Sequence, residues 1–198
     1  MSLQPERDSQ LADLTFQSAD IQAKPKENGM SICSINKPKN TSDEVTNKLR
    51  NAFIHRALWM GLILKEVKER GLDWEDIGHA AIFSTGCMHG EGIKERMDTP
   101  DSMIEFADKF LNEDVKKVFE MEIKKLDESE LRVEFGYCPL VTAWTQAGIE
   151  GDMLKKLCNI AMSGDRGIGS RFENFDFHLG KTIAEGNKVC EVAFVRKK

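Results

Sequence analysis

Apolar residues recur at every third or fourth position after residue 41, which is the spacing of one face of an α-helix. Thr41 followed by Glu44 fits a capping box at the start of this pattern, and Gly71 ends it. The apolar positions between them are Val45, Leu49, Phe53, Ala57, Met60, Leu64 and Val67. The pattern predicts a long amphipathic helix that begins at Thr41 and ends before Gly71.

Further helices are expected in the region that follows. Asp73 can cap a helix that contains Trp74 and Ile82, and the run Gly86–Gly92 predicts a loop after it. Thr99-Pro100 marks another helix start, with threonine as the cap and proline in the first turn. A last helical stretch is expected over 113–126.

The spacing of the apolar residues changes near residue 130, from every third or fourth position to every second position. Leu131, Val133, Phe135 and Tyr137 alternate with polar or small residues, which predicts a half-buried strand. Helices are expected over 139–147 and 152–162, then a glycine-rich loop, a strand over 175–179, a turn at Gly186-Asn187 and a return strand over 189–196. The predicted fold class is α+β: N-terminal helices, then a small antiparallel sheet with a C-terminal hairpin and intervening helices.

Residues 1–41 differ in composition from the rest of the chain. They hold three of the five prolines (Pro5, Pro25 and Pro38) and many polar residues. We expect a poorly ordered or peripheral N-terminal arm over 1–41 and a single α+β domain over 42–198. Within that domain, 42–128 is the helical part and 129–198 contains the sheet.

Composition narrows the class of protein. Among 198 residues, 40% are hydrophobic and the formal net charge is −5, which argues against a general nucleic-acid binder. No secretory signal or membrane-spanning apolar run is evident in the sequence. The five cysteines form no CxxC pair, so a reduced cytoplasmic protein is expected, with no membrane or nucleic-acid partner and no indicated oligomeric state.

Cys138 is the first candidate for chemistry. It ends a predicted strand and precedes Pro139, which opens a predicted helix. The unpaired N–H groups and the dipole of a helix N-terminus lower the pKa of a thiol and favour the reactive thiolate. The alternative is a cysteine used as a small core residue, as we expect for Cys158 and Cys190.

Charged residues near the C-terminus supply further candidates. Arg166, in the run Gly164–Gly169, could clamp a carboxylate, with Asp165 beside it; the alternative is a helix end and a solvated turn. His178 lies on a predicted strand and could move a proton, or be half exposed without a role. Cys87 and His89 lack the spacing of a zinc site, and we expect neither a metal nor a cofactor.

Several segments after Tyr137 resemble the L-2-amino-thiazoline-4-carboxylic acid hydrolase family. They are Tyr137-Cys138-Pro139-Leu140-Val141 with Trp144, Leu157-Cys158 with Gly164-Asp165, and Lys181-Thr182-Ile183-Ala184-Glu185-Gly186 with Cys190-Glu191-Val192-Ala193-Phe194. The resemblance implies a hydrolase that opens the ring of L-2-amino-thiazoline-4-carboxylate, or of a related cyclic carbon–nitrogen substrate, to a carbamoyl amino acid on the route to cysteine.

Such a reaction needs a nucleophile or activated water, a proton donor and a cation for the substrate carboxylate. The candidate catalytic residues are therefore Cys138 as nucleophile, with Asp165 and His178 to move protons. The candidate substrate-binding residues are Arg166 and Arg171 for the carboxylate, with Tyr137 and Trp144 from the matching segments.

A second function remains open, a non-catalytic, sensor-like domain that binds a small molecule on the same scaffold. The C-terminal hairpin also resembles vinyl-reductase-type small-molecule-binding domains, in which a glycine turn precedes a cysteine before the last strand. Some of those domains hold zinc through a glutamate and a cysteine, where this chain has Leu179 and Thr182.

Overall fold

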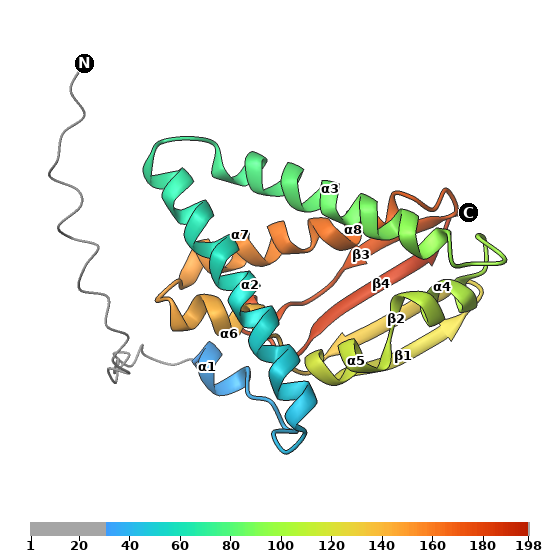
Figure 1. Cartoon of the computed structure of the whole chain (residues 1–198), viewed down its shortest axis with the longest axis horizontal. Helices are drawn as coiled ribbons and strands as arrows, with labels where there is room; N and C mark the ends of the chain where they lie inside the picture. The colour runs from blue at the N-terminus through green and yellow to red at the C-terminus, as the bar shows by residue number, and fades with distance from the viewer. Residues whose placement is uncertain (1–30, 198) are drawn as a thin grey trace, which may run out of the picture.

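Helices come first along the chain and most of the strands come later, as the residue pattern predicted (Figure 1). The computed structural model describes residues 31–197. The helical elements are α1 (Ile32–Ile35), α2 (Glu44–Glu69), α3 (Trp74–Lys94), α4 (Met103–Phe110), α5 (Glu113–Phe119), α6 (Pro139–Gln146), α7 (Gly151–Ala161), α8 (Ser163–Gly169) and the 3₁₀ turn η1 (Ile183–Glu185). The strands are β1 (Met121–Asp127), β2 (Glu130–Phe135), β3 (Phe175–Leu179) and β4 (Cys190–Arg196).

The strands form one antiparallel sheet with the order β1-β2-β4-β3. Val133 pairs with Val192, which pairs in turn with Leu179, so one face of the sheet is apolar. The opposite face carries polar residues such as Glu134 and His178, as strand alternation requires. The α+β class predicted from the sequence is therefore confirmed.

Aromatic rings join the helices to this apolar face. Phe106 of α4 is fully buried and contacts Phe194 of β4, with 4.8 Å between ring centroids. It also contacts Phe172 and Phe175, at 4.9 and 5.4 Å. Edge-to-face contacts of this kind add to the free energy gained by burying the rings. The sheet and α4 therefore share one hydrophobic core.

The long helix α2 starts slightly later than predicted. Asp43, and not Thr41, is its N-cap, because the Asp43 carboxylate accepts hydrogen bonds from the N–H groups of Val45 and Thr46. Helix α4 likewise starts at the cap Ser102, and not at Thr99. Asp73 does cap α3, as predicted.

The loop predicted over 86–92 is wrong, because α3 runs without a break from Trp74 to Lys94. Gly86 and Gly90 allow α3 to cross α8 closely, and a Cβ on Gly86 would lie 2.0 Å from the Gly164 carbonyl oxygen. The glycine-rich loop predicted after α7 is also wrong, since 163–169 form α8. Packing between the two helices outweighs the low helix propensity of glycine.

The helix predicted over 113–126 is only half correct. Helix α5 ends at Phe119, and Glu120 follows in the left-handed conformation with φ 50°. The chain then enters β1, which is an edge strand and mostly exposed. The charged residues of β1 obscured its alternation, so the sequence pattern looked like a solvated helix face. The first strand thus lies within 42–128, the region expected to be helical.

The connection from β3 to β4 is longer than the tight turn predicted at Gly186-Asn187. It contains η1, whose N-cap Thr182 and third residue Glu185 form a capping box. Gly186 ends η1 with φ 94°, a conformation that glycine adopts without strain. The two strands still pair as antiparallel neighbours.

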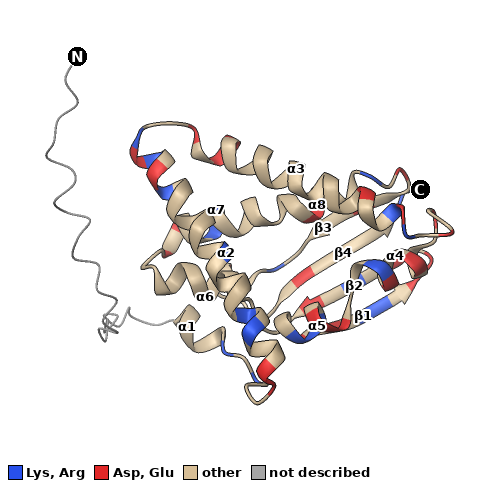
Figure 2. Cartoon of the chain, viewed as in Figure 1, with Lys and Arg blue, Asp and Glu red and all other residues tan. Residues whose placement is uncertain are grey.

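Two helices carry long stretches without a charged residue, and one of them, α3, still exposes Ile77, Phe83 and Met88 to solvent. Helix α6 carries none, and α3 carries none between Asp76 and Glu91 (Figure 2). Trp144 of α6 is fully buried, and its indole N–H donates to the Ala57 carbonyl oxygen of α2 at 2.8 Å. None of the helices within 31–197 is both long and apolar enough to cross a membrane.

The last part of the expected N-terminal arm packs on the domain. Asn36 is buried and bonds the Cys138 backbone twice, accepting from its N–H at 2.8 Å and donating to its carbonyl oxygen at 2.9 Å. Its amide also donates to Thr142 at 3.0 Å. Residues 1–30 of the expected arm lie outside the described residues.

Candidate small-molecule pocket

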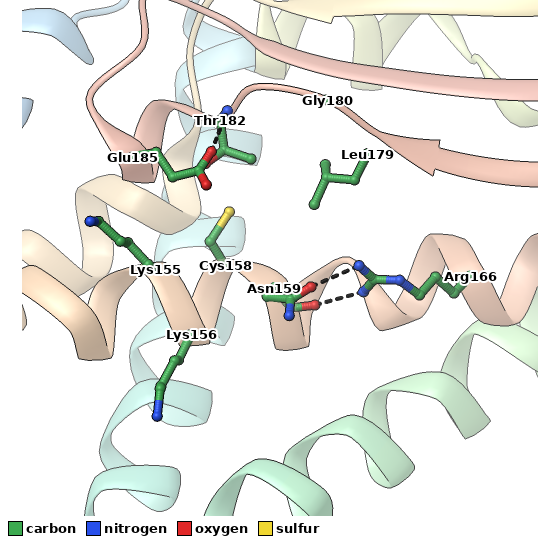
Figure 3. A pocket seen from close by; sticks show the side chains of 9 residues that line it. All are labelled: Lys155, Lys156, Cys158, Asn159, Arg166, Leu179, Gly180, Thr182 and Glu185. Carbon is green, nitrogen blue, oxygen red and sulfur yellow. Dashed lines mark hydrogen bonds between the residues drawn. The ribbon is translucent and has the colours of Figure 1, made fainter.

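A pocket of about 410 Å³ lies between the α7–α8 helix pair and the segment that joins β3 to β4 (Figure 3). Its lining residues are Lys155, Lys156, Cys158, Asn159, Arg166, Leu179, Gly180, Thr182 and Glu185. Three of these carry a positive charge and one carries a negative charge. The pocket can therefore attract a small anion and still offer a carboxylate to a cationic group.

Helical geometry explains why the basic residues meet there. Helix α8 follows α7 almost without a break, because Met162, in the right-handed helical conformation, is both the C-cap of α7 and the N-cap of α8. At about 100° per residue, positions 155, 159 and 166 fall on one helical face. The side chains of Lys155, Asn159 and Arg166 therefore line the same pocket.

Arg166 is held in a defined orientation. Its guanidinium donates to the Asn159 carbonyl oxygen at 2.9 Å and to the Asn159 side-chain oxygen at 2.7 Å. The ring of Phe177 lies beneath it, 5.7 Å from Cζ to the centroid. Lys156 is engaged by Glu75 at 2.6 Å, whereas Lys155 forms no ion pair with any residue of 31–197.

The opposite wall comes from η1. Glu185 Oε2 accepts from the N–H of Thr182 at 3.0 Å and from its hydroxyl at 2.8 Å. Glu185 is exposed to solvent, and its Oε1 makes no hydrogen bond with a described residue. The capping box thus fixes the carboxyl group and leaves one oxygen for a ligand.

Cys158 is the cysteine that lines the pocket. Burial raises the pKa of its thiol to about 12, with a further rise from the neighbouring Cys138, while Thr182 and Arg166 act in the opposite direction. The thiol is therefore protonated at neutral pH and can serve as a weak donor rather than as a thiolate. Sequence reasoning expected only packing for this residue.

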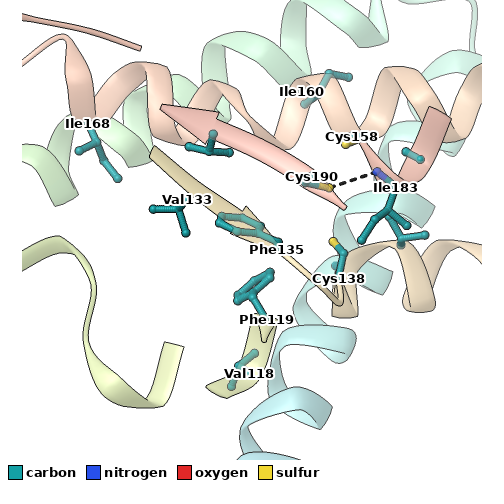
Figure 4. Packing of buried hydrophobic residues seen from close by; sticks show 14 of the residues in the cluster. Val118, Phe119, Val133, Phe135, Cys138, Cys158, Ile160, Ile168, Ile183 and Cys190 are labelled. Carbon is teal, nitrogen blue, oxygen red and sulfur yellow. Dashed lines mark hydrogen bonds between the residues drawn. The ribbon is translucent and has the colours of Figure 1, made fainter. Parts of the chain in front are cut away.

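Cys138 does not line the pocket. It lies at the N-terminus of α6, as predicted, but is only 8% exposed and belongs to the hydrophobic core (Figure 4). Burial raises the pKa of its thiol to about 11, although the N–H groups of Val141 and Leu140 lower it. The expected lowering of the Cys138 pKa is wrong, because desolvation outweighs the helix N-terminus.

The two residues expected to move protons lie elsewhere. Asp165 is half-buried on α8, and burial raises the pKa of its carboxyl group to about 6. His178 is exposed on β3, on the polar face of the sheet that the strand pattern predicted. Neither residue is among those that line the pocket.

The remaining candidates have structural contacts. Arg171 pairs with Glu91 at 3.4 Å, away from the pocket. Tyr137 is buried and accepts a hydrogen bond from Thr142 at 3.0 Å. Trp144 fills the interface between α6 and α2. Among the seven residues expected from the sequence, Arg166 is the one that the structure brings to this pocket.

Sequence reasoning missed Lys155, Asn159 and Glu185, although a pattern for Glu185 was available. Thr182-Ile183-Ala184-Glu185 has the spacing of a capping box and lies in a segment that resembles the family. Lys155 and Asn159 could not be found from one sequence, because exposed polar residues on a helix are usually solvated.

The part of the chain that the structure describes contains no cluster of three or more histidine, cysteine or acidic side chains that could hold a metal ion. Cys87 lies on α3, where its thiol is 3.6 Å from the Ser170 hydroxyl. His79 donates to or accepts from Ser163 at 2.7 Å.

The model of the L-2-amino-thiazoline-4-carboxylic acid hydrolase family matches residues 50–194, which include every residue that lines the pocket. No curated protein matches the chain. Since the match covers most of the chain, the protein belongs to the L-2-amino-thiazoline-4-carboxylic acid hydrolase family.

Proposed function

We propose that the chain hydrolyses L-2-amino-thiazoline-4-carboxylate, or a related cyclic carbon–nitrogen substrate, in the pocket between α7, α8 and η1. The observation that carries this proposal is the charge arrangement in one pocket: Lys155 and Arg166 on one wall, Glu185 on the other. Such a substrate has a carboxylate at one end and a basic, amidine-like group in the ring. Each end of the substrate therefore faces a wall of opposite charge.

In this proposal Arg166 and Lys155 hold the substrate carboxylate, and Glu185 faces the reacting ring. Glu185 takes a proton from a water molecule while the water oxygen attacks the ring carbon between nitrogen and sulfur. The electron pair of the carbon–nitrogen double bond moves to the ring nitrogen, which takes up the proton that Glu185 holds. The carbon–sulfur bond then breaks, its electron pair goes to sulfur, and the proton of the added hydroxyl group transfers to sulfur as the carbonyl forms. The product is N-carbamoyl-cysteine, which contains the substrate atoms plus one water.

Water is a better candidate nucleophile here than a cysteine of the chain. The pKa of Cys158 is about 12 and that of Cys138 about 11, so both thiols are protonated near neutral pH. A covalent route through Cys138, expected from the sequence, also requires the substrate to reach a buried side chain. Cys138→Ser separates the two routes, because it abolishes turnover only in the covalent one.

The test is turnover of L-2-amino-thiazoline-4-carboxylate by the purified chain, with the product identified by mass. Glu185→Gln preserves the acceptor of the capping box and removes the charge, so kcat should fall about 100-fold or more. Glu95→Gln, an exposed residue at the end of α3, is the matched control. Wild-type turnover by Glu185→Gln would overturn the role of Glu185.

The alternative is a binding domain without catalysis, which the same charged pocket would also serve. A ligand that binds only the folded state raises the Tm. If the same compound raises the Tm of the wild-type chain and no product forms, the binding function replaces the hydrolase.

A further inference from the structure

Asn159 is engaged entirely with one pocket residue. Its backbone and side-chain oxygens both accept from the Arg166 guanidinium, from Nη1 at 2.9 Å and Nη2 at 2.7 Å (Figure 3). Asn159 itself is exposed and lines the same pocket. This bidentate contact restricts the rotamers of the arginine side chain before any ligand binds.

We infer that Asn159 is a positioning residue that holds Arg166 ready for the carboxylate of the substrate, an inference that rests on the proposed function. A guanidinium has five N–H donors, and Asn159 engages two of them. The remaining donors stay available for a carboxylate. Phe177 supports the guanidinium from below, at 5.7 Å.

Lys155 provides the contrast within the same pocket. It is exposed, and no residue of 31–197 forms an ion pair with it. A flexible ammonium group attracts a carboxylate but does not fix its orientation. A guanidinium held by two hydrogen bonds attracts the carboxylate and also fixes its orientation. Arg166 thereby sets the orientation of the carboxylate, and Asn159 sets the orientation of Arg166.

A purely structural role for the contact is the competing explanation. The Asn159 carbonyl belongs to the last turn of α7, where arginine side chains commonly satisfy unpaired carbonyl groups. Such a role predicts a change in Tm with no change in ligand affinity. A positioning role predicts a change in KM that disappears when Arg166 is absent.

The test is a double-mutant cycle on the full chain with Asn159→Ala, Arg166→Gln and the double variant. L-2-amino-thiazoline-4-carboxylate is the probe, and KM, kcat and the ligand-induced rise in Tm are measured. Asn159→Ala removes the side-chain acceptor and keeps the backbone one, so the guanidinium is then held by one hydrogen bond. We expect it to raise KM about three- to tenfold with little change in kcat, since the remaining ordering of the guanidinium occurs on binding. In the Arg166→Gln background the same change should have no further effect.

Asn51→Ala, on an exposed part of α2, is the matched control and should leave all three quantities unchanged. Wild-type affinity in Asn159→Ala, or an undiminished effect in the Arg166→Gln background, overturns the inference. Binding without turnover by the wild type, with Asn159→Ala weakening it, overturns the hydrolase but supports the positioning role. Absence of both binding and turnover in the wild type overturns both.

Discussion

Cys138 and Asp165 are two residues at which burial opposes a favourable local interaction. At Cys138 the N–H groups at the start of α6 stabilise a thiolate, and at Asp165 the neighbouring Arg166 stabilises a carboxylate. In both cases desolvation is the larger effect and raises the pKa. The sequence reveals the local partner of such a residue but not the depth at which it lies.

Asp165→Asn should stabilise the protein above about pH 6 and have little effect below about pH 4. The folded-state pKa, about 6, lies above the ordinary value of 3.8, so the folded chain keeps a proton that the unfolded chain loses. Stability therefore falls as the pH rises through this window. Asp165 is half-buried, and its contact with solvent weakens the effect of desolvation. The expected gain in the free energy of unfolding is therefore on the order of 1–3 kcal/mol.

The measurement is urea unfolding of both proteins at about pH 4 and at about pH 7.5, on either side of the titration. Glu173→Gln, an exposed acid before β3, controls for the loss of one negative charge. An equal gain at both pH values would show that the carboxyl group does not titrate in this window.

At the scale of elements, close packing between α3 and α8 keeps their glycine-containing stretches helical, although glycine has a low helix propensity. Gly86 and Gly90 of α3, with Gly167 of α8, let the two backbones approach, and a Cβ on Gly167 would lie 2.3 Å from the Phe83 carbonyl oxygen. A run of glycines predicts a loop from sequence, because isolated helices of such composition are unstable. The same glycines are what the crossing of α3 and α8 requires.

Gly86→Ala should lower the free energy of unfolding by about 3 kcal/mol or more, because its Cβ meets the Gly164 backbone, which cannot move aside easily. Gly92→Ala is the matched control on the same helix, since nothing lies within 4 Å of its Cβ position. It should be neutral or stabilising by up to about 1 kcal/mol, as alanine favours helix. Urea unfolding compares the two, and equal stabilities would contradict the close crossing.

At the scale of the whole molecule, residues 36–40 connect parts of the chain that are distant in sequence. Asn36 bonds the Cys138 turn, and the N–H groups of Lys39 and Asn40 donate to the Glu120 carboxylate at 2.6 and 3.0 Å. Arg50, buried in α2, also pairs with Glu120 at 3.0 Å. This segment precedes the region that the family model matches, yet it is anchored to the core.

Asn36→Ala should lower the free energy of unfolding by about 2–4 kcal/mol, because the buried N–H and carbonyl of Cys138 each lose a partner. Ser34→Ala, at an exposed position in α1 just before this segment, should change the free energy of unfolding by less than about 0.5 kcal/mol. Chemical unfolding gives both values. A loss as small as that of Ser34→Ala would mean that the segment does not stabilise the domain.

The sequence by itself determined most of the helices and strands, the α+β class and the family, because helix and strand periods and short motifs are local properties of the chain. Only the tertiary structure decided that Gly86–Gly92 stays helical, that Cys138 is buried, and that Lys155, Arg166 and Glu185 share one pocket. Burial and contacts between distant segments depend on how the elements pack. The pattern of neighbouring residues in the sequence shows neither the burial of a side chain nor its contacts with distant segments.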